Sequence, residues 1–220
     1  MSDLSVNSGR KYTRIKVCGI TSVNDAILCA EAGVDAIGLV FYEKSPRLVS
    51  VDIAADISRA VGPFVTVVGL FVDASPVYIQ AVLSSVSLHV LQFHGNESEA
   101  FCRQFDRPFI KALRIADDTD IHSVAARYNG ASGLLLDTYR KGMPGGTGET
   151  FNWQLVPHHL GGRITLAGGL NTGNVVQAID AVKPYAVDVS GGVESAPGVK
   201  DRGKIRSFIG AVRELNRQVP

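Results

Sequence analysis

Short apolar runs alternate along the chain with stretches whose apolar positions recur every three or four residues. Eight of the runs are rich in β-branched residues and apolar nearly throughout, which is typical of parallel strands buried on both faces. The predicted strands are Arg14–Cys18, Asp35–Phe41, Phe64–Val72, Leu88–Phe93, Phe109–Arg114, Gly133–Asp137, Arg163–Ala167 and Tyr185–Val189.

The stretches between these runs carry the start and stop signals of helices. Ser22 with Asp25 has the spacing of a capping box, and Gly33 predicts the end of the same helix. Ser75–Pro76 is an N-cap followed by proline at the first helical position. Further helices are predicted to start at Asn96 with Glu99 and at Thr172, to lie around Asp118 to Tyr128, and to bury the stripe Ile205, Phe208, Ile209 and Val212.

Eight β-then-α units within 220 residues predict an α/β protein with a single (β/α)₈ barrel of near-minimal size. An open doubly wound sheet is the alternative. Such a sheet more often has fewer strands, and no G-x-G-x-x-G follows the first strand here. The segment from Thr138 to Asn152 is too long for a plain connector, so we expect a mobile active-site loop or, alternatively, a surface insertion.

The charge balance limits the kinds of ligand that the protein can bind. The chain has 22 Lys and Arg against 21 Asp and Glu, which excludes a broad basic surface for nucleic acid but leaves room for a small anionic substrate. Its three cysteines are far apart and form no C-x-x-C pair, so we expect neither a disulfide framework nor a structural zinc site. The polar N-terminus and the shortness of the longest apolar run, Phe64–Val72, predict a protein of the cytoplasm without membrane contact.

In a barrel of this kind, chemistry lies at the C-terminal ends of the strands. Two glycine pairs, Gly168–Gly169 and Gly191–Gly192, follow the last two predicted strands, and Ser190 precedes the second pair. Glycine lets the backbone approach a ligand closely, and free N–H groups at a helix start attract an anion. The pairs therefore predict a phosphate site, although tight βα turns would also favour glycine.

Four side chains at other strand ends are candidates for chemistry. Cys18 could act as base or nucleophile, or be a small core residue. Asp137 ends an apolar run, where a carboxyl group can serve as a general acid, or alternatively as a cap or ion-pair partner. Arg47 presents a fork suited to a carboxylate or phosphate, or is a solvated loop charge. His94 could bind a ligand, carry a proton, orient another group or be structural, and no second ligand lies at metal spacing beside it.

Seven motifs in this order, each at a strand end, resemble the phosphoribosylanthranilate isomerase family. They are Lys16–Thr21, Ser45–Arg47, Gln92–Gly95, Leu135–Thr138, Gly145–Gly148 with Phe151 and Trp153, Leu166–Leu170, and Val189–Ser195 followed by Gly198, Lys200 and Asp201. The resemblance runs from about residue 14 to residue 210. We therefore expect residues 1–13 to be a disordered N-terminal extension and residues 14–220 to form the barrel.

The resemblance implies an Amadori rearrangement in tryptophan biosynthesis, from N-(5-phosphoribosyl)anthranilate to 1-(2-carboxyphenylamino)-1-deoxyribulose 5-phosphate. By the family pattern, Asp137 is the general acid and Cys18 the general base. Arg47 would hold the anthranilate carboxylate, and the backbone around Gly169, Gly191 and Gly192 would hold the phosphate. We count Ser190 and His94 among the substrate-binding residues. An ordinary Asp titrates at about 3.9 and Cys at about 8.5, so these roles require a raised Asp137 pKa, a lowered Cys18 pKa or a minority form that reacts fast.

The resemblance implies no cofactor and no metal. The expected partner is the small phosphosugar-anthranilate substrate, and the expected assembly is a monomer or a homodimer. Two alternatives remain. A related phosphosugar barrel, such as the histidine-pathway isomerase, is expected to use two carboxylates, whereas this chain has Cys18 at the first strand. A barrel retained as an inert scaffold would have no reason to keep acid, base and both anion sites.

Overall fold

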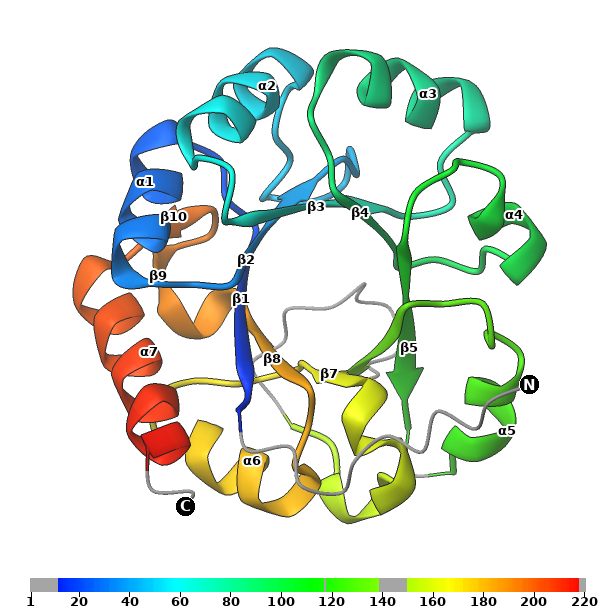
Figure 1. The fold of residues 1–220 in the computed structure, drawn as a ribbon, viewed down its shortest axis with the longest axis vertical. Coiled ribbons are helices and arrows are strands. Elements are labelled where there is room, and N and C mark those ends of the chain that lie inside the picture. The colour runs from blue at the N-terminus through cyan, green and yellow to red at the C-terminus, as the bar shows by residue number, and fades with distance from the viewer. Residues whose placement is uncertain (1–11, 117, 139–149, 218–220) are drawn as a thin grey trace.

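Eight parallel strands form a closed barrel in the computed structural model, which describes residues 12–116, 118–138 and 150–217. The strands follow one another around the ring in chain order, and β1 pairs with β8 to close it (Figure 1). The (β/α)₈ prediction is therefore confirmed. The strands are β1 (Arg14–Cys18), β2 (Ala36–Val40), β3 (Thr66–Phe71), β4 (Val90–Phe93), β5 (Phe109–Ile115), β6 (Gly133–Thr138), β7 (Ile164–Leu166) and β8 (Ala186–Val189).

Each of the eight apolar runs contains a strand, because side chains on both faces of the sheet are covered by the barrel interior or by helices. The ends of the runs differ from the strands by up to two residues. Phe64, for example, was placed in the third strand but precedes β3 and is 96% exposed. In contrast, β5 and β6 each extend one residue beyond the predicted end, to Ile115 and Thr138.

Helices surround the barrel and cover its outer face (Figure 1). Ser22 Oγ accepts a hydrogen bond from the Asp25 amide at 3.1 Å, and Gly33 ends the first helix with a φ of 86°, as predicted. Ser75 caps the third helix in the same way. The α-helices are α1 (Val23–Ala32), α2 (Val51–Ala60), α3 (Pro76–Ser85), α4 (Glu99–Arg103), α5 (Ile121–Ala126), α6 (Val175–Val182) and α7 (Arg202–Arg217).

Two predicted helix starts are wrong by two residues. Ser98, not Asn96, caps α4, because its hydroxyl accepts from the Phe101 amide, whereas Asn96 donates to Asp73. Asn174, not Thr172, precedes α6. In both cases a polar residue two positions closer to the helix is the N-cap residue.

The connections after β6 and β8 also depart from a simple repeat. In the described residues after β6, two 3₁₀ helices, η1 (Trp153–Leu155) and η2 (His158–Arg163), replace the expected α-helix, in a segment with Pro157 and two glycines. The predicted mobile loop falls largely on 139–149, outside the described residues. After β8 come a third 3₁₀ helix, η3 (Gly191–Val193), and the hairpin β9 (Glu194–Ala196) and β10 (Val199–Lys200).

The N-terminal extension predicted for 1–13 falls largely outside the described residues, which begin at Tyr12. Thr13 pairs with α7: its amide donates to Asn216 Oδ1 at 2.9 Å, and Asn216 Nδ2 donates back to the Thr13 carbonyl at 3.0 Å. None of the helices in the described part of the chain is long and apolar enough to cross a membrane.

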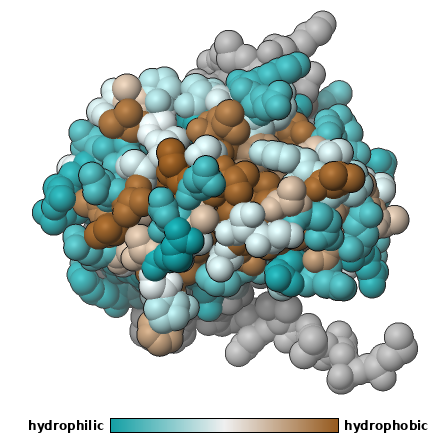
Figure 2. Space-filling model, turned by 90° about the horizontal axis from the view of Figure 1, so that it is seen from above, coloured by the Kyte–Doolittle hydropathy of each residue, from teal (hydrophilic) through white to brown (hydrophobic). Residues whose placement is uncertain are grey.

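Figure 2 views the molecule from the side of α2 and α3, where hydrophobic residues lie among hydrophilic ones. The exposed large apolar side chains of these two helices include Ile53 on α2 and Val77 and Tyr78 on α3. Single exposed apolar side chains are normal on a protein surface. The concave site of the molecule lies elsewhere, at the mouth of the barrel.

Candidate active site

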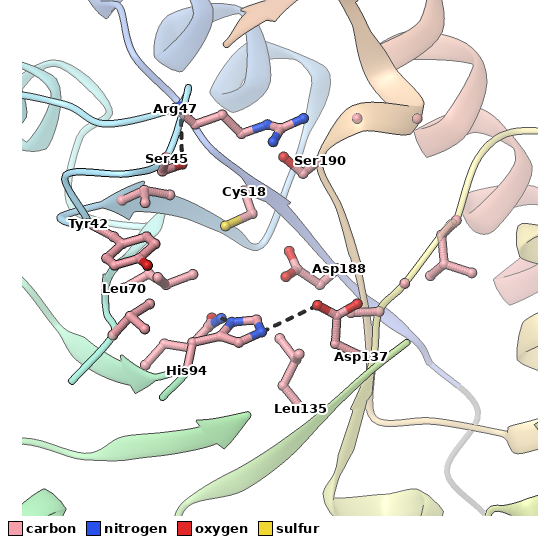
Figure 3. Close-up of a pocket in the computed structure, with 18 of the residues that line it drawn as sticks. Cys18, Tyr42, Ser45, Arg47, Leu70, His94, Leu135, Asp137, Asp188 and Ser190 are labelled. Carbon is pink, nitrogen blue, oxygen red and sulfur yellow. Dashed lines mark hydrogen bonds and ion pairs between the residues drawn. The ribbon is translucent and has the colours of Figure 1, made fainter. Parts of the chain in front are cut away.

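A cavity of about 610 Å³ opens at the C-terminal ends of the barrel strands. All the site residues predicted from the sequence line it: Cys18, Arg47, His94, Asp137, Gly169, Ser190, Gly191 and Gly192. Figure 3 shows Cys18, His94 and Asp137 pointing into one space from β1, from the end of β4 and from β6. The fold thus brings together residues that are up to 174 positions apart in the chain, from Cys18 to Gly192.

Cys18 ends β1 and is buried beside the ammonium group of Lys16. Burial raises the pKa of the Cys18 thiol above its ordinary value; Lys16 opposes the rise, and the Asp188 carboxylate adds to it. The lowered Cys18 pKa that we considered from the sequence is therefore not found. A side chain at Gly38 would lie 2.7 Å from Cys18 Sγ, so this glycine makes room for the thiol.

Lys16 is held by a two-pronged ion pair. Its Nζ lies 3.0 Å from both carboxylate oxygens of Asp188, and both side chains are buried. Burial disfavours the ammonium, but Asp188 and Cys18 outweigh that cost, so the pKa of Lys16 is raised and its charge is kept. A fixed positive charge therefore lies next to the thiol.

Asp137 lies one residue before the end of β6, with one oxygen bound to the backbone and the other facing a histidine. Oδ1 accepts from the Thr138 amide at 2.9 Å, and Oδ2 lies 3.3 Å from Nε2 of His94. His94 Nδ1 in turn lies 3.1 Å from the side-chain amide nitrogen of Gln92. The Thr138 amide thus orients the carboxyl group by a hydrogen bond, and His94 contacts its other oxygen. Asp137 is only 7% exposed.

Arg47 reaches the cavity from the loop after β2, where the Ser45 hydroxyl accepts from its amide. Its guanidinium donates to Glu194 twice, from Nε at 2.8 Å and from Nη2 at 2.7 Å. Lys200 binds the same carboxylate at 2.8 Å and also donates to the Cys18 carbonyl at 2.6 Å. Arg47 is therefore positioned by an acidic partner that the sequence analysis did not assign to it.

The two glycine pairs meet at the rim between β7 and β8. A side-chain carbon on Gly192 would lie 2.0 Å from the Leu170 carbonyl oxygen, so this glycine is required for one loop to pack on the other. At Gly191 the nearest atom would be Arg47 Nη2 at 3.4 Å, which is ordinary contact. The hydroxyl of Ser190 is buried beside them and has no hydrogen-bond partner in the described structure.

The comparisons with known proteins agree on one family. The profile of N-(5'-phosphoribosyl)anthranilate (PRA) isomerase matches residues 15–211. The chain belongs to this family. A PRA isomerase of Pseudomonas aeruginosa is 55% identical over 204 residues, which cover 93% of this chain and 97% of the relative.

Solved structures of PRA isomerases have the same fold. The Thermotoga maritima enzyme superposes with a TM-score of 0.83 at 41% identity, covering 92% of this chain and 99% of its own. Another, with a TM-score of 0.79 at 39% identity and covering 92% of this chain and 99% of its own, was solved in complex with reduced 1-(o-carboxyphenylamino)-1-deoxyribulose 5-phosphate. The predictions of an enzyme and of its isomerase family are confirmed.

Several residues in and around the cavity were not predicted from the sequence. Asp188 and Arg114 line the cavity, and Lys16, Glu194 and Lys200 bind residues that line it. A signal was available for three of them, because Lys16, Arg114 and Asp188 are charged positions within largely apolar strands. In the described parts of the chain, no group of three His, Cys, Asp or Glu side chains is placed to hold a metal ion.

Proposed function

We propose that the chain converts N-(5-phosphoribosyl)anthranilate to 1-(2-carboxyphenylamino)-1-deoxyribulose 5-phosphate, with Asp137 as general acid and Cys18 as general base. The observation that carries the proposal is the shared cavity: in a member of the PRA isomerase family, the Asp137 carboxyl group and the Cys18 thiol line the same cavity, from β6 and β1. The substrate is an anion at both ends, which suits a cavity lined by Arg47 and by the glycine loops.

The first step opens the ribose ring. Asp137 would give its proton to the furanose ring oxygen while the bond from that oxygen to C1 breaks. The lone pair of the anthranilate nitrogen then forms a C1–N double bond, which yields a protonated Schiff base. Proton transfer of this kind by a positioned side chain is worth about 10²–10⁴ in rate.

The second step moves a hydrogen from carbon. The Cys18 thiolate would remove the proton at C2, and the electrons of that bond form a C1–C2 double bond while the iminium is neutralised. The resulting enolamine becomes the ketone when C1 gains a proton and the C2 hydroxyl loses one. Lys16, beside the thiol, favours the thiolate that this step requires.

The anion sites would divide between the two sides of the mouth. Arg47 would bind the anthranilate carboxylate, and the backbone at Gly169, Gly191 and Gly192 with the Ser190 hydroxyl would bind the phosphate. The buried, unpaired Ser190 hydroxyl supports this, because such a group usually has a partner. The absence of a cofactor, a cytoplasmic location and a monomer or homodimer stay predictions.

A fluorescence assay that follows the consumption of freshly made N-(5-phosphoribosyl)anthranilate tests the activity itself. The purified chain should consume the substrate without added metal or cofactor, and chelator should leave the rate unchanged. The product should have the same mass as the substrate by mass spectrometry, while the fluorescence of the substrate is lost. No consumption above the spontaneous breakdown of the substrate would refute the proposed function.

A further inference from the structure

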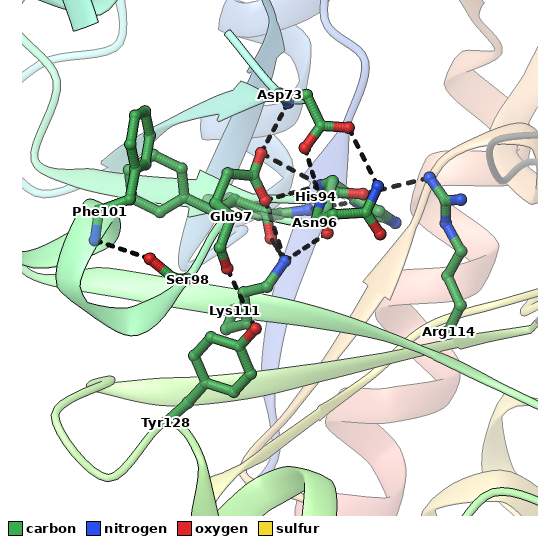
Figure 4. Close-up of polar contacts among 12 residues, drawn as sticks. Asp73, His94, Asn96, Glu97, Ser98, Phe101, Lys111, Arg114 and Tyr128 are labelled. Atoms are coloured by element: carbon green, nitrogen blue, oxygen red, sulfur yellow. Dashed lines mark hydrogen bonds and ion pairs between the residues drawn. The ribbon is translucent and has the colours of Figure 1, made fainter. Parts of the chain in front are cut away.

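The backbone around His94 is fixed by two cations of β5. Three consecutive carbonyls accept from them: Lys111 Nζ donates to Phe93 at 3.2 Å and to Gly95 at 2.6 Å, and Arg114 Nη2 donates to His94 at 3.2 Å (Figure 4). Glu97 completes the arrangement, because its carboxylate binds Lys111 at 3.0 Å and accepts from the Gly95 amide. The backbone that carries the His94 ring is therefore held independently of Asp137.

The His94 ring joins a buried amide to the carboxyl group of Asp137. Nδ1 faces the side-chain nitrogen of Gln92 at 3.1 Å, and Nε2 lies 3.3 Å from Asp137 Oδ2. Nε2 is buried and makes no hydrogen bond in the described structure, so the carboxylate oxygen is the group that it faces. Gln92 is fully buried, and its Oε1 has no hydrogen-bond partner in the described structure. Turning the amide end for end would therefore break no hydrogen bond except the one to His94.

A neutral imidazole has one donor and one acceptor, so the partner of Nδ1 decides the role of Nε2. When the Gln92 amide presents N–H to Nδ1, the proton lies on Nε2, which donates to an Asp137 carboxylate. When the amide presents its oxygen, the proton lies on Nδ1, and Nε2 accepts from a protonated Asp137. The described structure has the first arrangement, with the amide nitrogen of Gln92 against Nδ1.

We infer that Gln92 and His94 form a positioning pair for Asp137, in which the Gln92 amide N–H holds His94 as the neutral tautomer with its proton on Nε2, so that Nε2 donates to the Asp137 carboxylate left after proton transfer. The Asp137 proton goes to the ring oxygen of the substrate, and the imidazole proton stays on Nε2. The inference rests on the proposed function, because it takes Asp137 as the general acid. The inference explains why a buried amide with one hydrogen-bonding end lies beside His94. His94 is then a positioning residue, because it acts on the substrate only through Asp137.

Titratable groups on three other strands lie around the same cavity and set the electrostatic background of this pair. Lys16 and Cys18 lie on β1, Arg114 lies on β5, and Asp188 on β8 interacts electrostatically with both Asp137 and His94. Variants at Gln92 leave all of these groups in place. A change that follows a Gln92 substitution can therefore be assigned to the amide.

The test compares Gln92→Glu and Gln92→Leu with the wild type by ¹⁵N NMR of the His94 ring, assigned with His94→Asn. A carboxylate at position 92 can only accept, so Gln92→Glu should protonate both ring nitrogens at neutral pH and hold Asp137 ionised. The Gln92→Leu ring should lose its single tautomer. In both variants kcat should fall by about tenfold or more, part of the 10²–10⁴ of acid catalysis, while KM changes by less than about twofold.

Gln80→Glu, the same change at an exposed position of α3, is the matched control and should leave kcat and the His94 signals unchanged. If Gln92→Glu fails to fold by circular dichroism, Gln92→Met keeps the length of the side chain and should behave like Gln92→Leu. Wild-type ring signals and wild-type kcat in the Gln92 variants would overturn the inference. Failure of the proposed function would show differently, as an Asp137→Asn variant that keeps its kcat.

Discussion

The Arg47 guanidinium donates two hydrogen bonds to the Glu194 carboxylate, at 2.8 and 2.7 Å, although the two residues are 147 positions apart. This pairing fixes the guanidinium at the rim of the cavity before any substrate arrives. Burial disfavours the Glu194 carboxylate, but hydrogen bonds from Arg47 and Lys200 outweigh it and hold the pKa of Glu194 below its ordinary value. A residue of β9 thus positions the arginine that the loop after β2 supplies.

Substitution Arg47→Ala should weaken substrate binding, because one or two charge-assisted hydrogen bonds of roughly 1.5–3 kcal/mol each are lost. KM and the dissociation constant of a product analogue should therefore rise about tenfold or more, with a smaller change in kcat. Arg59→Ala removes an exposed arginine of α2 and serves as the control. Unchanged KM and analogue affinity in Arg47→Ala would remove Arg47 from the substrate site.

The lowered Glu194 pKa makes a prediction for stability against pH. A group whose folded pKa is depressed contributes stability above its unfolded pKa, and this is lost as the pH falls through the folded value. The unfolding temperature should therefore drop below about pH 4.5, the ordinary value for this group. Measured by calorimetry from pH 7 downwards, the drop should be shallower in Glu194→Gln. Parallel curves for the two proteins would contradict the prediction.

Gly191 and Gly192 should respond differently to alanine. At Gly192 the new methyl group would meet the Leu170 carbonyl at 2.0 Å, so Gly192→Ala should lower the melting temperature and disturb both loops. At Gly191 the fold has room, with 3.4 Å to the nearest atom, so Gly191→Ala should keep the melting temperature. Its dissociation constant for inorganic phosphate should nevertheless rise. Wild-type phosphate affinity in a folded Gly191→Ala protein would place the phosphate elsewhere.

Lys16→Met should raise the pKa of Cys18 further, because it removes the ammonium that opposes the effect of burial. The thiolate is the active form of the proposed base, so the rise of activity with pH should move to higher pH. Thiolate absorbance, read as the difference from Cys18→Ala, measures the pKa directly. Burial raises the pKa of Cys29 and of Cys102 to about 12, so neither interferes near neutrality.

Folding of the Lys16→Met protein needs its own control, because removing one partner of a buried ion pair costs about 3–5 kcal/mol. The double variant Lys16→Met with Asp188→Leu removes both charges and should recover part of that stability. A Cys18 pKa that is unchanged in a folded Lys16→Met protein would show that Lys16 has no influence on the base.

The strands and the main site residues were predictable because both follow from local patterns. A strand covered on both faces is apolar nearly throughout, and the carboxyl ends of parallel strands meet at one mouth, which brings Cys18, His94 and Asp137 together. The helix starts at Asn96 and Thr172 were wrong, because several polar residues near a helix compete for one cap and sequence alone does not rank them.

The partners of the site residues were not predictable in the same way. Lys16 and Asp188 are 172 positions apart and face each other only because closure of the barrel puts them in register on β1 and β8. Glu194 binds Arg47, and Lys200 binds the Cys18 carbonyl. Both come from the hairpin of β9 and β10, which is not part of the repeating β-then-α pattern of the sequence. Such pairs depend on the closed topology rather than on any segment.

The division of roles between Cys18 and Asp137 is the central claim, and kcat of Cys18→Ala and Asp137→Asn tests it most directly. Each should be reduced by about 10²–10⁴, while KM changes much less because neither residue is assigned to an anion of the substrate. Circular dichroism confirms that both variants fold. A Cys18→Ala or Asp137→Asn protein that keeps a near wild-type kcat would contradict the account.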